Sequence, residues 1–325
     1  GMAVYTKLSR KQIESMLDRD QLGKLLSVEP VLDGIENTNY FISVASTPAG
    51  AVGEYLLTVF EQLESSELTF YMRWLSRLKN SGLPVAPAIV DVDGRTLQQL
   101  VNRPAALFNK LEGSHPQQTN HRQCHAIGAA LGRLHAAALE IRESHAGPRG
   151  LSWLIKLAES IRSNICPSDR ATMDRALISC QRLLKRSDLP HGLIHGDLFP
   201  DNALFKGNQL TGMVDFFSGG EGLFGFDLAV AINAWSEDAR GALNERKHQA
   251  LVAGYQNHRT KSLRERELWA DFLIVAATRF WVSRLADRLL PATGNMQDSF
   301  RKSKDPEVYR RILQNHLDRS PMAPL

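Results

Sequence analysis

Hydrophobic and polar positions in the first part of the chain predict a small unit of strands and helices. Ile13, Met16 and Leu17 recur at helical spacing, whereas later segments alternate between apolar and polar residues as half-buried strands do. Clusters of Gly, Pro, Asn and Asp separate these segments and predict turns. The expected order is a helix at 9–26, strands at 38–45 and 54–61, a helix at 65–81, and strands at 96–100 and 105–111.

From about Thr119 the pattern changes to helical spacing and keeps it for most of the remaining chain. A loop-forming stretch at 111–116 separates the two parts, which predicts an N-terminal lobe at 1–111 and a C-terminal lobe at 112–325. The predicted fold class is therefore α+β. Helices are expected at 152–165, 169–186, 227–235, 245–257, 264–290 and 305–317, interrupted by a non-helical stretch at 191–217.

Composition and charge argue against several classes of protein. The 325 residues are 43% hydrophobic and 23% charged, as in ordinary globular proteins, and no apolar run reaches the roughly 18 residues of a membrane span. The net charge of +4 is mild and the chain lacks a long basic run with interleaved aromatic residues, so nucleic acid is not an expected partner. Cys124, Cys166 and Cys180 are far apart, which predicts free thiols and a cytoplasmic location. These features leave the oligomeric state open.

The candidate chemistry lies in the non-helical stretch. His195, Asp197 and Asn202 follow the spacing H-x-D-x-x-x-x-N, and Asp215-Phe216 comes thirteen residues after Asn202. Residues in this order serve phosphoryl transfer from a nucleotide, where the protein supplies a carboxylate beside the attacking hydroxyl and ligands for magnesium. Asp197 is therefore the candidate catalytic residue, and Asn202 and Asp215 are the candidate metal ligands.

A hairpin is expected between the two halves of this motif. Residues 207–208, Gly-Asn, are a two-residue turn signal between apolar-rich runs. Pairing outward from that turn sets Asn202 opposite Met213 and puts Asp215 on the face of Asn202, about 7 Å farther along. Taken alone, Asp215 is typical of a structural turn residue, but the complete array favours function. His195 is interpreted as a packed, hydrogen-bonded brace for the loop rather than as a base.

The motif resembles that of the aminoglycoside phosphotransferase and choline kinase group, which has the protein-kinase-like fold. Residues 195–202, 215–216 and 225–229 carry this resemblance. A closer similarity to the bacterial homoserine kinases of that group runs through the segments 34–41, 56–61, 82–85 and 279–285. The resemblance implies a two-lobe fold with a small mixed β-sheet N-lobe and a larger, mainly helical C-lobe. It also implies transfer of the ATP γ-phosphate, with Mg²⁺, to the hydroxyl of L-homoserine, giving O-phospho-L-homoserine in threonine biosynthesis.

The resemblance makes Gly34, Asn37, Thr38 and Asn39 the cofactor-binding candidates, in a loop over the ATP phosphates. The chain departs from the group at Thr58, which stands where many relatives have Lys or Arg, and the usual glutamate partner is not evident either. Loss of both partners avoids an unpaired buried charge. The α- and β-phosphates must therefore be held in another way.

Three further positions are candidates for roles around this motif. Asp227 precedes an apolar helical run and is expected to be its N-cap, which is a structural role. Arg279 and Arg284 lie on an otherwise apolar helix, where a guanidinium invites a carboxylate partner. That partner is either a protein acid or the carboxylate of the substrate, so both arginines are candidate substrate-binding residues.

Other functions stay open on the sequence alone. Among kinases, choline would need an aromatic cage, an aminoglycoside would need an acidic pocket, and methylthioribose is a third alternative substrate. A metallophosphoesterase would need further His ligands, and the other His residues show no such pattern. A catalytically inactive nucleotide-binding module would explain the missing lysine, but it would not explain why Asp197 is present.

Overall fold

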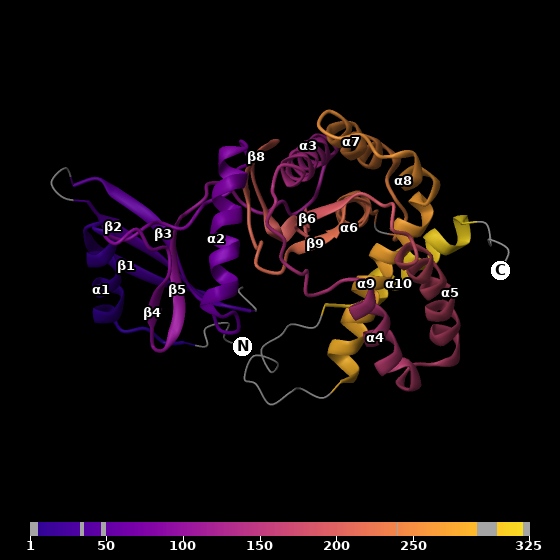
Figure 1. Cartoon of the computed structure of the whole chain (residues 1–325), viewed down its shortest axis with the longest axis horizontal. Coiled ribbons are helices and arrows are strands. Elements are labelled where there is room, and N and C mark those ends of the chain that lie inside the picture. The colour runs from indigo at the N-terminus through magenta and orange to yellow at the C-terminus, as the bar shows by residue number, and fades with distance from the viewer. Residues whose placement is uncertain (1–5, 33–35, 47–49, 239, 291–303, 321–325) are drawn as a thin grey trace. The chain divides into compact units, whose positions relative to one another are not determined.

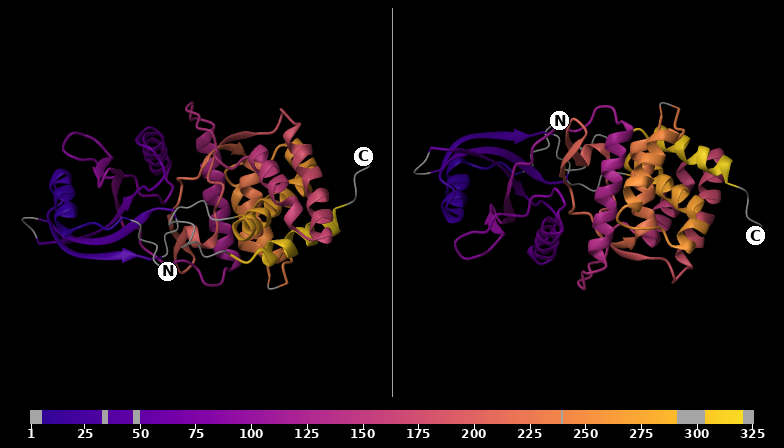
Figure 2. Two further views of the ribbon diagram at one scale, coloured as in Figure 1. Left: turned by 90° about the horizontal axis from the view of Figure 1, so that it is seen from below. Right: turned by 90° about the horizontal axis from the view of Figure 1, so that it is seen from above.

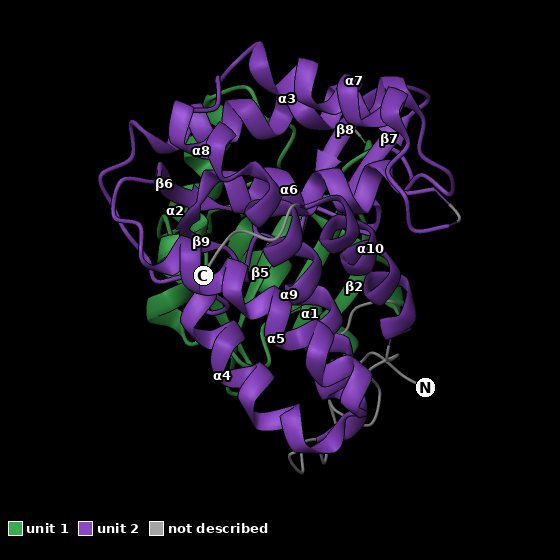
Figure 3. Ribbon diagram, turned by 90° about the vertical axis from the view of Figure 1, so that its right-hand side faces the viewer, with its two compact units in different colours: residues 1–112, 292–302 green, residues 113–291, 303–325 purple. Residues whose placement is uncertain are grey.

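The computed structural model describes residues 6–32, 36–46, 50–238, 240–290 and 304–320. The chain divides into two compact units, which Figure 3 shows in different colours. The first unit comprises residues 1–112 with 292–302, and the second comprises 113–291 with 303–325. The predicted α+β class is confirmed, because the first unit is built on a sheet and the second is mainly helical. The predicted lobe boundary after residue 111 stays a proposal about domain organisation.

The first unit is built on a five-stranded sheet in the order β1-β2-β3-β5-β4 (Figure 1). Every adjacent pair of strands runs antiparallel, so strand directions in this sheet are not mixed. Along β2, Tyr40, Ile42 and Val44 are buried in one core cluster with Ile13 and Met16 of α1, so α1 packs on that face. The elements are α1 (Arg10–Asp20), β1 (Lys24–Val31), β2 (Thr38–Ala45), β3 (Val52–Val59), α2 (Ser65–Asn80), β4 (Gln98–Leu100) and β5 (Arg103–Asn109).

The helix expected at 9–26 is shorter than predicted, and the first strand of the sheet was missed. Helix α1 ends at Asp20 because Gln21 adopts a left-handed conformation with φ of 53°. Gly23 follows with φ of 122°, and a Cβ there would lie 2.1 Å from the carbonyl oxygen of Ala45. The chain therefore turns sharply against β2 and begins β1 at Lys24.

The second unit is a group of helices with two small two-stranded sheets, β6-β9 and β7-β8; Figure 2 shows it from two further sides. Helix α9 is its centre: residues 271–282 are all buried, and α4, α5, α6 and α10 contact it. The helix expected at 264–290 is two helices, because the chain breaks at Leu268.

The helices of this unit are α3 (His121–Ala138), α4 (Leu151–Ile161), α5 (Pro167–Leu184), α6 (Phe224–Ser236), α7 (Glu245–Gln256), α8 (Leu263–Glu267), α9 (Trp269–Leu289) and α10 (Pro306–Arg319). Its strands are β6 (His191–Ile194), β7 (Ala203–Lys206), β8 (Gln209–Met213) and β9 (Gly220–Leu223). Two single 3₁₀ turns are η1 (Arg162–Asn164) and η2 (Pro200–Asn202).

Helices α3 and α7 cross with their backbones in contact, and two glycines make this possible. A Cβ on Gly128 of α3 would lie 1.9 Å from the Leu251 carbonyl oxygen, and one on Gly254 of α7 would lie 2.1 Å from that of His125. Any larger residue at either position would push the helices apart. The close crossing also brings Tyr255 of α7 within hydrogen-bonding distance of α3.

The three cysteines are free, as predicted. Cys124 and Cys180 are buried, and burial raises the pKa of their thiols to about 11 and about 12, respectively. Both side chains therefore act as protonated, apolar packing groups. Within the described part of the chain, no helix combines the length and apolar character needed to cross a membrane.

His316 of α10 is a buried histidine that joins α10 to α6. Its Nε2 lies 2.7 Å from the Asn233 side-chain oxygen, and the Asn233 amide donates to the Leu273 carbonyl oxygen at 3.2 Å. Burial lowers the pKa of His316 from 6.5 to about 4, and the charges of Arg319 and His248 act in the same direction. The imidazole is thus neutral in the fold and donates its Nε2 proton to Asn233.

We expect this histidine to make the stability of the fold depend on pH between about 6.5 and 4. Below pH 6.5 the unfolded chain takes up a proton that folded His316 resists, so the free energy of unfolding falls as the pH falls. Between pH 7 and pH 4.5 the loss due to this group should be about 2 kcal/mol. Urea unfolding at both pH values should show this extra loss in the wild type and not in His316→Gln; equal losses in the two proteins would contradict the assignment.

Candidate active site

Asp197, the candidate catalytic residue, lies in the loop between β6 and the 3₁₀ turn η2. Its side chain is half-buried. Burial raises the pKa of the Asp197 carboxyl above its ordinary value, while the charges of His195 and Arg279 act in the opposite direction. Asp201 raises this pKa further, and Arg149 lowers it. The carboxylate therefore lies in a partly dry site with several cationic groups around it.

His195 is a brace for this loop, as interpreted from the sequence. Its side chain is fully buried, and its Nε2 lies 2.8 Å from the Val214 carbonyl oxygen. Its Nδ1 accepts the Asp197 backbone N–H at 3.1 Å, and Phe216 packs edge-on against the ring at 4.7 Å. Because both ring nitrogens are used within the fold, the imidazole has no nitrogen left to act as a base toward a substrate.

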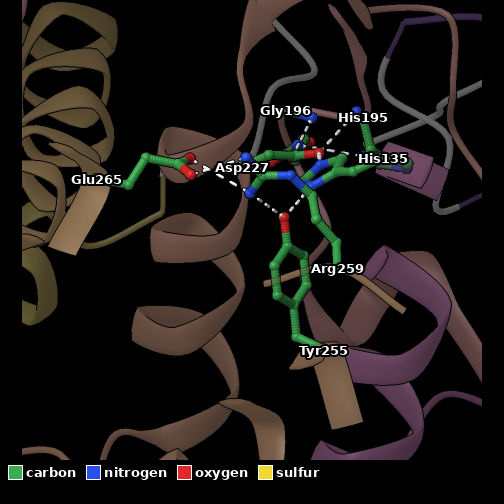
Figure 4. A network of polar contacts seen from close by, with 8 residues as sticks. His135, His195, Gly196, Asp227, Tyr255, Arg259 and Glu265 are labelled. Atoms are coloured by element: carbon green, nitrogen blue, oxygen red, sulfur yellow. Dashed lines mark hydrogen bonds and ion pairs between the residues drawn. The ribbon is translucent and has the colours of Figure 1, made fainter. Parts of the chain in front are cut away.

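Asp227 fixes the backbone of the same loop from behind (Figure 4). Its Oδ1 accepts the Gly196 N–H at 2.8 Å, and its Oδ2 accepts the His195 N–H at 3.1 Å and the His135 side chain at 2.8 Å. Burial by itself would raise the pKa of Asp227, but the hydrogen bond from His135, together with the N–H donors of the loop, lowers it. Asp227 is therefore an ionised anchor for the loop.

The prediction that Asp227 caps a helix is wrong, although its structural role is supported. Helix α6 begins at Phe224 with Leu223 at the N-cap, which places Asp227 inside the first turn. The apolar run that suggested the helix start continues toward the N-terminus through Phe224 and Phe226. The carboxylate consequently points to another segment of the chain and not to its own helix.

A buried chain of hydrogen bonds continues outward from Asp227 (Figure 4). His135 lies with its Nδ1 2.6 Å from the Tyr255 hydroxyl, which in turn accepts from Arg259 at 3.0 Å. Arg259 also donates to Glu265 at 2.7 Å, and Glu265 is fully buried. Burial lowers the pKa of His135, so a neutral imidazole donates to Asp227 and accepts from Tyr255. The only sign of this network in the sequence is His135, which shares helical spacing with the apolar residues Ile127, Leu131 and Leu134.

Asn202, a candidate metal ligand, faces Asp197 directly. Its Nδ2 donates to the Asp197 carbonyl oxygen at 2.8 Å and to the Asp197 carboxylate at 3.4 Å. This orientation of the amide leaves Oδ1 as the oxygen that can face a cation. The Val214 N–H donates to the Asn202 carbonyl oxygen at 3.0 Å, so the residue before Asp215 is tied to Asn202.

The predicted hairpin exists, but its register differs beyond the turn. Pairing starts at Lys206 and Gln209 as expected, and a β-bulge between Phe205 and Leu204 then shifts the register by one residue, so that Ala203 faces Met213. The predicted pairing of Asn202 with Met213 is therefore wrong. Thr211 stabilises the bulge by donating its hydroxyl to the Leu204 carbonyl oxygen at 3.2 Å.

Asp215 therefore does not reach this region by strand alternation. Its φ of 63° places it in the left-handed region, where the strand geometry has ended, and its side chain is exposed. Such a conformation is uncommon for a residue other than glycine and is often found at functional sites. The structure places Asp215 directly after the residue that pairs with Asn202, and its metal-binding role stays a proposal.

The donor atoms suit magnesium better than a metal that needs a full protein cage. Asn202 offers an amide oxygen and Asp215 a carboxylate, which are hard oxygen ligands. Across residues 6–320 as far as the structure describes them, no cluster of three or more His, Cys, Asp or Glu side chains could hold a metal ion. Magnesium fits because it keeps waters and phosphate oxygens as most of its ligands. A two-metal phosphoesterase site gains no support from these residues.

The nucleotide candidates in the first unit are partly committed to the fold. Thr38 is fully buried, and its hydroxyl donates to Glu61 at 2.6 Å and accepts the Thr6 N–H at 3.1 Å. The side-chain oxygen of Asn37 accepts the Glu61 N–H at 3.4 Å. Gly34 lies outside the described residues. Thr38 thus anchors the start of β2, and phosphate contact by this loop stays a proposal.

Thr58 occupies the position where the family resemblance implies a lysine or an arginine. Its hydroxyl donates to the side-chain oxygen of Asn39 at 2.6 Å, across the paired strands β2 and β3. Thr58 is buried, so a charge at this position would need a buried counter-charge. A neutral hydrogen bond between Thr58 and Asn39, which is itself a candidate nucleotide-binding residue, therefore replaces the expected cation.

Arg279 and Arg284 of α9 both interact electrostatically with Asp197. Arg279 lowers the pKa of Asp197, and Asp197 opposes the lowering of the Arg284 pKa that burial causes. The Arg279 guanidinium lies 4.9 Å from the Trp153 ring centre and 4.6 Å from that of Phe280, and it donates to the Ser283 hydroxyl. The faces of these two aromatic rings and the Ser283 hydroxyl thus help to position the Arg279 guanidinium.

A cluster of aromatic rings connects this arginine pair with the catalytic loop. Phe199 of that loop packs edge-on against Phe280 at 4.7 Å, and Phe280 contacts Tyr309 at 5.5 Å. Arg284 lies over Tyr309 at 4.5 Å, and Lys304 lies over Phe199 at 5.2 Å. Sequence reasoning found the two arginines but missed Lys304, Arg149 and Trp153, which reach the site from other segments.

Known proteins resemble this chain over most of its length. Residues 27–260 match the phosphotransferase enzyme family. A homoserine kinase of Pseudomonas aeruginosa (strain UCBPP-PA14) is 36% identical over 285 residues, 87% of this chain and 88% of that protein. One of Neisseria meningitidis serogroup B (strain MC58) is 33% identical over 312 residues, 96% of this chain and 99% of that protein.

Solved structures show the same fold. An amicoumacin kinase in complex with AMP-PNP and Ca²⁺ superposes with a TM-score of 0.68 at 16% identity, covering 97% of this chain and 98% of that chain. A microcompartment-associated aminopropanol kinase superposes with a TM-score of 0.69 at 18% identity, covering 95% and 96%. The expected kinase-like architecture is thereby confirmed.

Replacing Asp227 by Asn should destabilise the protein and disturb the catalytic loop. The variant amide presents an N–H₂ group to one of the donors that the carboxylate now accepts, so at least one buried hydrogen bond is lost. We expect a loss of about 2–3 kcal/mol in the free energy of unfolding. The matched control is Asp174→Asn, which removes a surface ion pair with Arg162 and should cost less than about 1 kcal/mol. Denaturant unfolding of the two variants tests this, and similar small losses in both would contradict it.

Proposed function

This chain belongs to the phosphotransferase enzyme family, and we propose that it transfers the γ-phosphate of ATP to the hydroxyl of L-homoserine, giving O-phospho-L-homoserine. Family membership makes it a small-molecule phosphotransferase. The choice of substrate is supported by relatives named homoserine kinase that match nearly the whole chain. Its product would then serve threonine biosynthesis.

The observation that carries this choice is the arginine pair beside Asp197. Arg279 and Arg284 both interact electrostatically with the carboxylate that would meet the attacking hydroxyl. A hydroxy amino acid has a carboxylate close to its hydroxyl, and a guanidinium is well suited to bind it. Choline, methylthioribose and aminoglycosides have no carboxylate to offer. Choline would also need bare aromatic faces, whereas cations of the protein cover the rings of Phe280 and Tyr309.

Asp197 would orient the substrate hydroxyl and accept its proton. Its raised pKa gives the carboxylate more basicity than an exposed aspartate has. Asn202 donates to the Asp197 carbonyl oxygen and carboxylate, which fixes the direction of the carboxylate. Asn202 and Asp215 would hold Mg²⁺, which neutralises charge on the phosphates when it is bound.

On the nucleotide side, Gly34, Asn37, Thr38 and Asn39 are the proposed residues for the phosphates. The buried Thr38–Glu61 hydrogen bond supports this by fixing where the loop enters β2. Since Thr58 supplies no charge, backbone N–H groups and magnesium would hold the α- and β-phosphates. The free cysteines support a cytoplasmic location for the enzyme.

Replacement of Asp197 by Asn should lower kcat by about 10²- to 10⁴-fold, because the amide cannot accept the hydroxyl proton. The measurement is magnesium-dependent ADP release with L-homoserine, choline, methylthioribose and an aminoglycoside as parallel substrates. The wild type should prefer L-homoserine, and Asp201→Asn, a change at an exposed acid of the same loop, should stay within about threefold of it.

Near-normal turnover by Asp197→Asn would remove Asp197 from the mechanism. Preference for another hydroxyl compound would overturn the substrate. Absence of ADP release with every compound would favour the inactive nucleotide-binding module, and phosphate release from simple phosphoesters would favour the phosphoesterase.

Asp215→Asn should raise the magnesium concentration needed for half-maximal activity by about tenfold or more, since the site loses its carboxylate ligand. Part of the lost turnover should return at high Mg²⁺ if the fold is intact. Titration of activity with Mg²⁺ at fixed ATP tests this. A variant with lower kcat but unchanged magnesium dependence would show that Asp215 has a structural role instead.

A further inference from the structure

Glu237, at the C-terminal end of α6, lines a small hollow in the second unit. The hollow has a volume of about 180 Å³ and is also lined by Asp238, Gly241, Val308 and Arg311. The Glu237 side chain is half-buried. Its carboxylate forms no hydrogen bond or ion pair with any residue that the structure describes. A partly buried carboxylate without such a partner is unusual in a folded protein.

Three cations surround Glu237 from separate helices, each beyond ion-pair distance. They are Arg284 of α9, Arg311 of α10 and Lys247 of α7, and Asp238 is the neighbouring acid. Burial raises the pKa of Glu237 to about 7, because these cations only partly offset the loss of hydration. A cationic ligand in direct contact with the Glu237 carboxylate would supply the stabilisation of its ionised form that the distant cations do not.

Arg284 links Glu237 electrostatically with the proposed substrate site. Both Glu237 and Asp197 interact electrostatically with Arg284 and with Tyr309, whose ring Arg284 covers. A hydroxy amino acid has three polar groups: a hydroxyl, a carboxylate and an ammonium. The proposed function places the first at Asp197 and the second at the arginine pair, and it leaves the ammonium without a partner.

Other acids near this region already have partners. Asp201 forms an ion pair with Lys304 at 3.1 Å. The Asp238 carboxylate accepts the backbone N–H groups of Arg240 and Ala242 at 2.8 Å and 3.1 Å, which closes its own loop. Of these three described acids, Glu237 is the one whose charge is available to a ligand.

We propose that Glu237 binds the α-ammonium group of the amino-acid substrate and so selects amino acids against hydroxy acids of the same length. This inference rests on the proposed function, because it assumes a substrate with an ammonium group next to its carboxylate. Arg284 and Glu237 together would then recognise the two charges on the α-carbon, while Asp197 meets the hydroxyl.

The test compares Glu237→Gln with the wild type on two substrates, L-homoserine and 4-hydroxybutanoate, which lacks the ammonium group. Loss of a charge-assisted contact should lower kcat/KM for L-homoserine by about 10- to 100-fold, chiefly through KM. The value for 4-hydroxybutanoate should change by less than about threefold, because that compound makes no contact with Glu237. The KM for ATP and the unfolding midpoint should stay as in the wild type.

A pH series provides a second readout. Ionised Glu237 binds the ammonium, so the wild-type KM for L-homoserine should fall as the pH rises from 6 to 8, through the pKa of about 7. This pH dependence should be absent in Glu237→Gln and absent for 4-hydroxybutanoate with either protein.

Asp238→Asn is the matched control, since it removes the neighbouring charge of the same hollow while its side-chain oxygen can still close the loop. It should leave both substrates within about threefold of the wild type. Equal losses on both substrates in Glu237→Gln would mean a structural role, and no loss on either would also overturn the proposal. If the wild type does not phosphorylate L-homoserine at all, the proposed function fails first, and this inference fails with it.

Discussion

The buried carboxylate of Asp227 is the interaction on which the geometry of the catalytic loop depends. An ionised group with no exposure is costly unless donors surround it, and here two backbone N–H groups of the loop and one imidazole do so. The same bonds that stabilise the charge hold Gly196, and therefore Asp197, against helix α6. His135 can donate only because Tyr255 satisfies its other nitrogen, and Tyr255 is in reach because α3 and α7 cross closely. Helix packing far from the loop thus determines the position of Asp197.

Positive charge is distributed differently from what the kinase resemblance implied. The expected cation on β3 is replaced by Thr58, which forms a neutral hydrogen bond with Asn39 inside the sheet. In the second unit, by contrast, Arg279, Arg284 and Arg149 all interact electrostatically with Asp197. A buried lysine in the sheet would need its own acid, whereas the three arginines lie near an acid that is already present. At position 58 the chain therefore has a neutral hydrogen bond instead of a cation, and three arginines interact with the proposed catalytic aspartate.

The sequence predicted those features that local residue patterns determine. It did not predict the features that depend on contacts between distant segments of the chain. The order of residues around Asp197 and most helices and strands follow from spacing and periodicity. The first strand was missed because apolar residues keep helical spacing through a turn that the backbone torsions of Gln21 create. The bulge at Thr211 depends on a side-chain hydrogen bond across the hairpin. The donors around Asp227 and the isolation of Glu237 arise from segments far apart in the chain, which no local pattern reports.

The way Arg284 is positioned explains how it can serve a substrate. An arginine held by a protein carboxylate has its charge largely neutralised, and a substrate carboxylate would have to compete with that acid. Arg284 is instead positioned by the ring of Tyr309 and by the Asp305 carbonyl oxygen, both of which are neutral. Stacking fixes the plane of a guanidinium and directs its N–H donors outward along the edge. Tyr309 and Phe280 belong to the ring cluster that includes Phe199 of the catalytic loop, so the rings that orient the cations also relate them to Asp197.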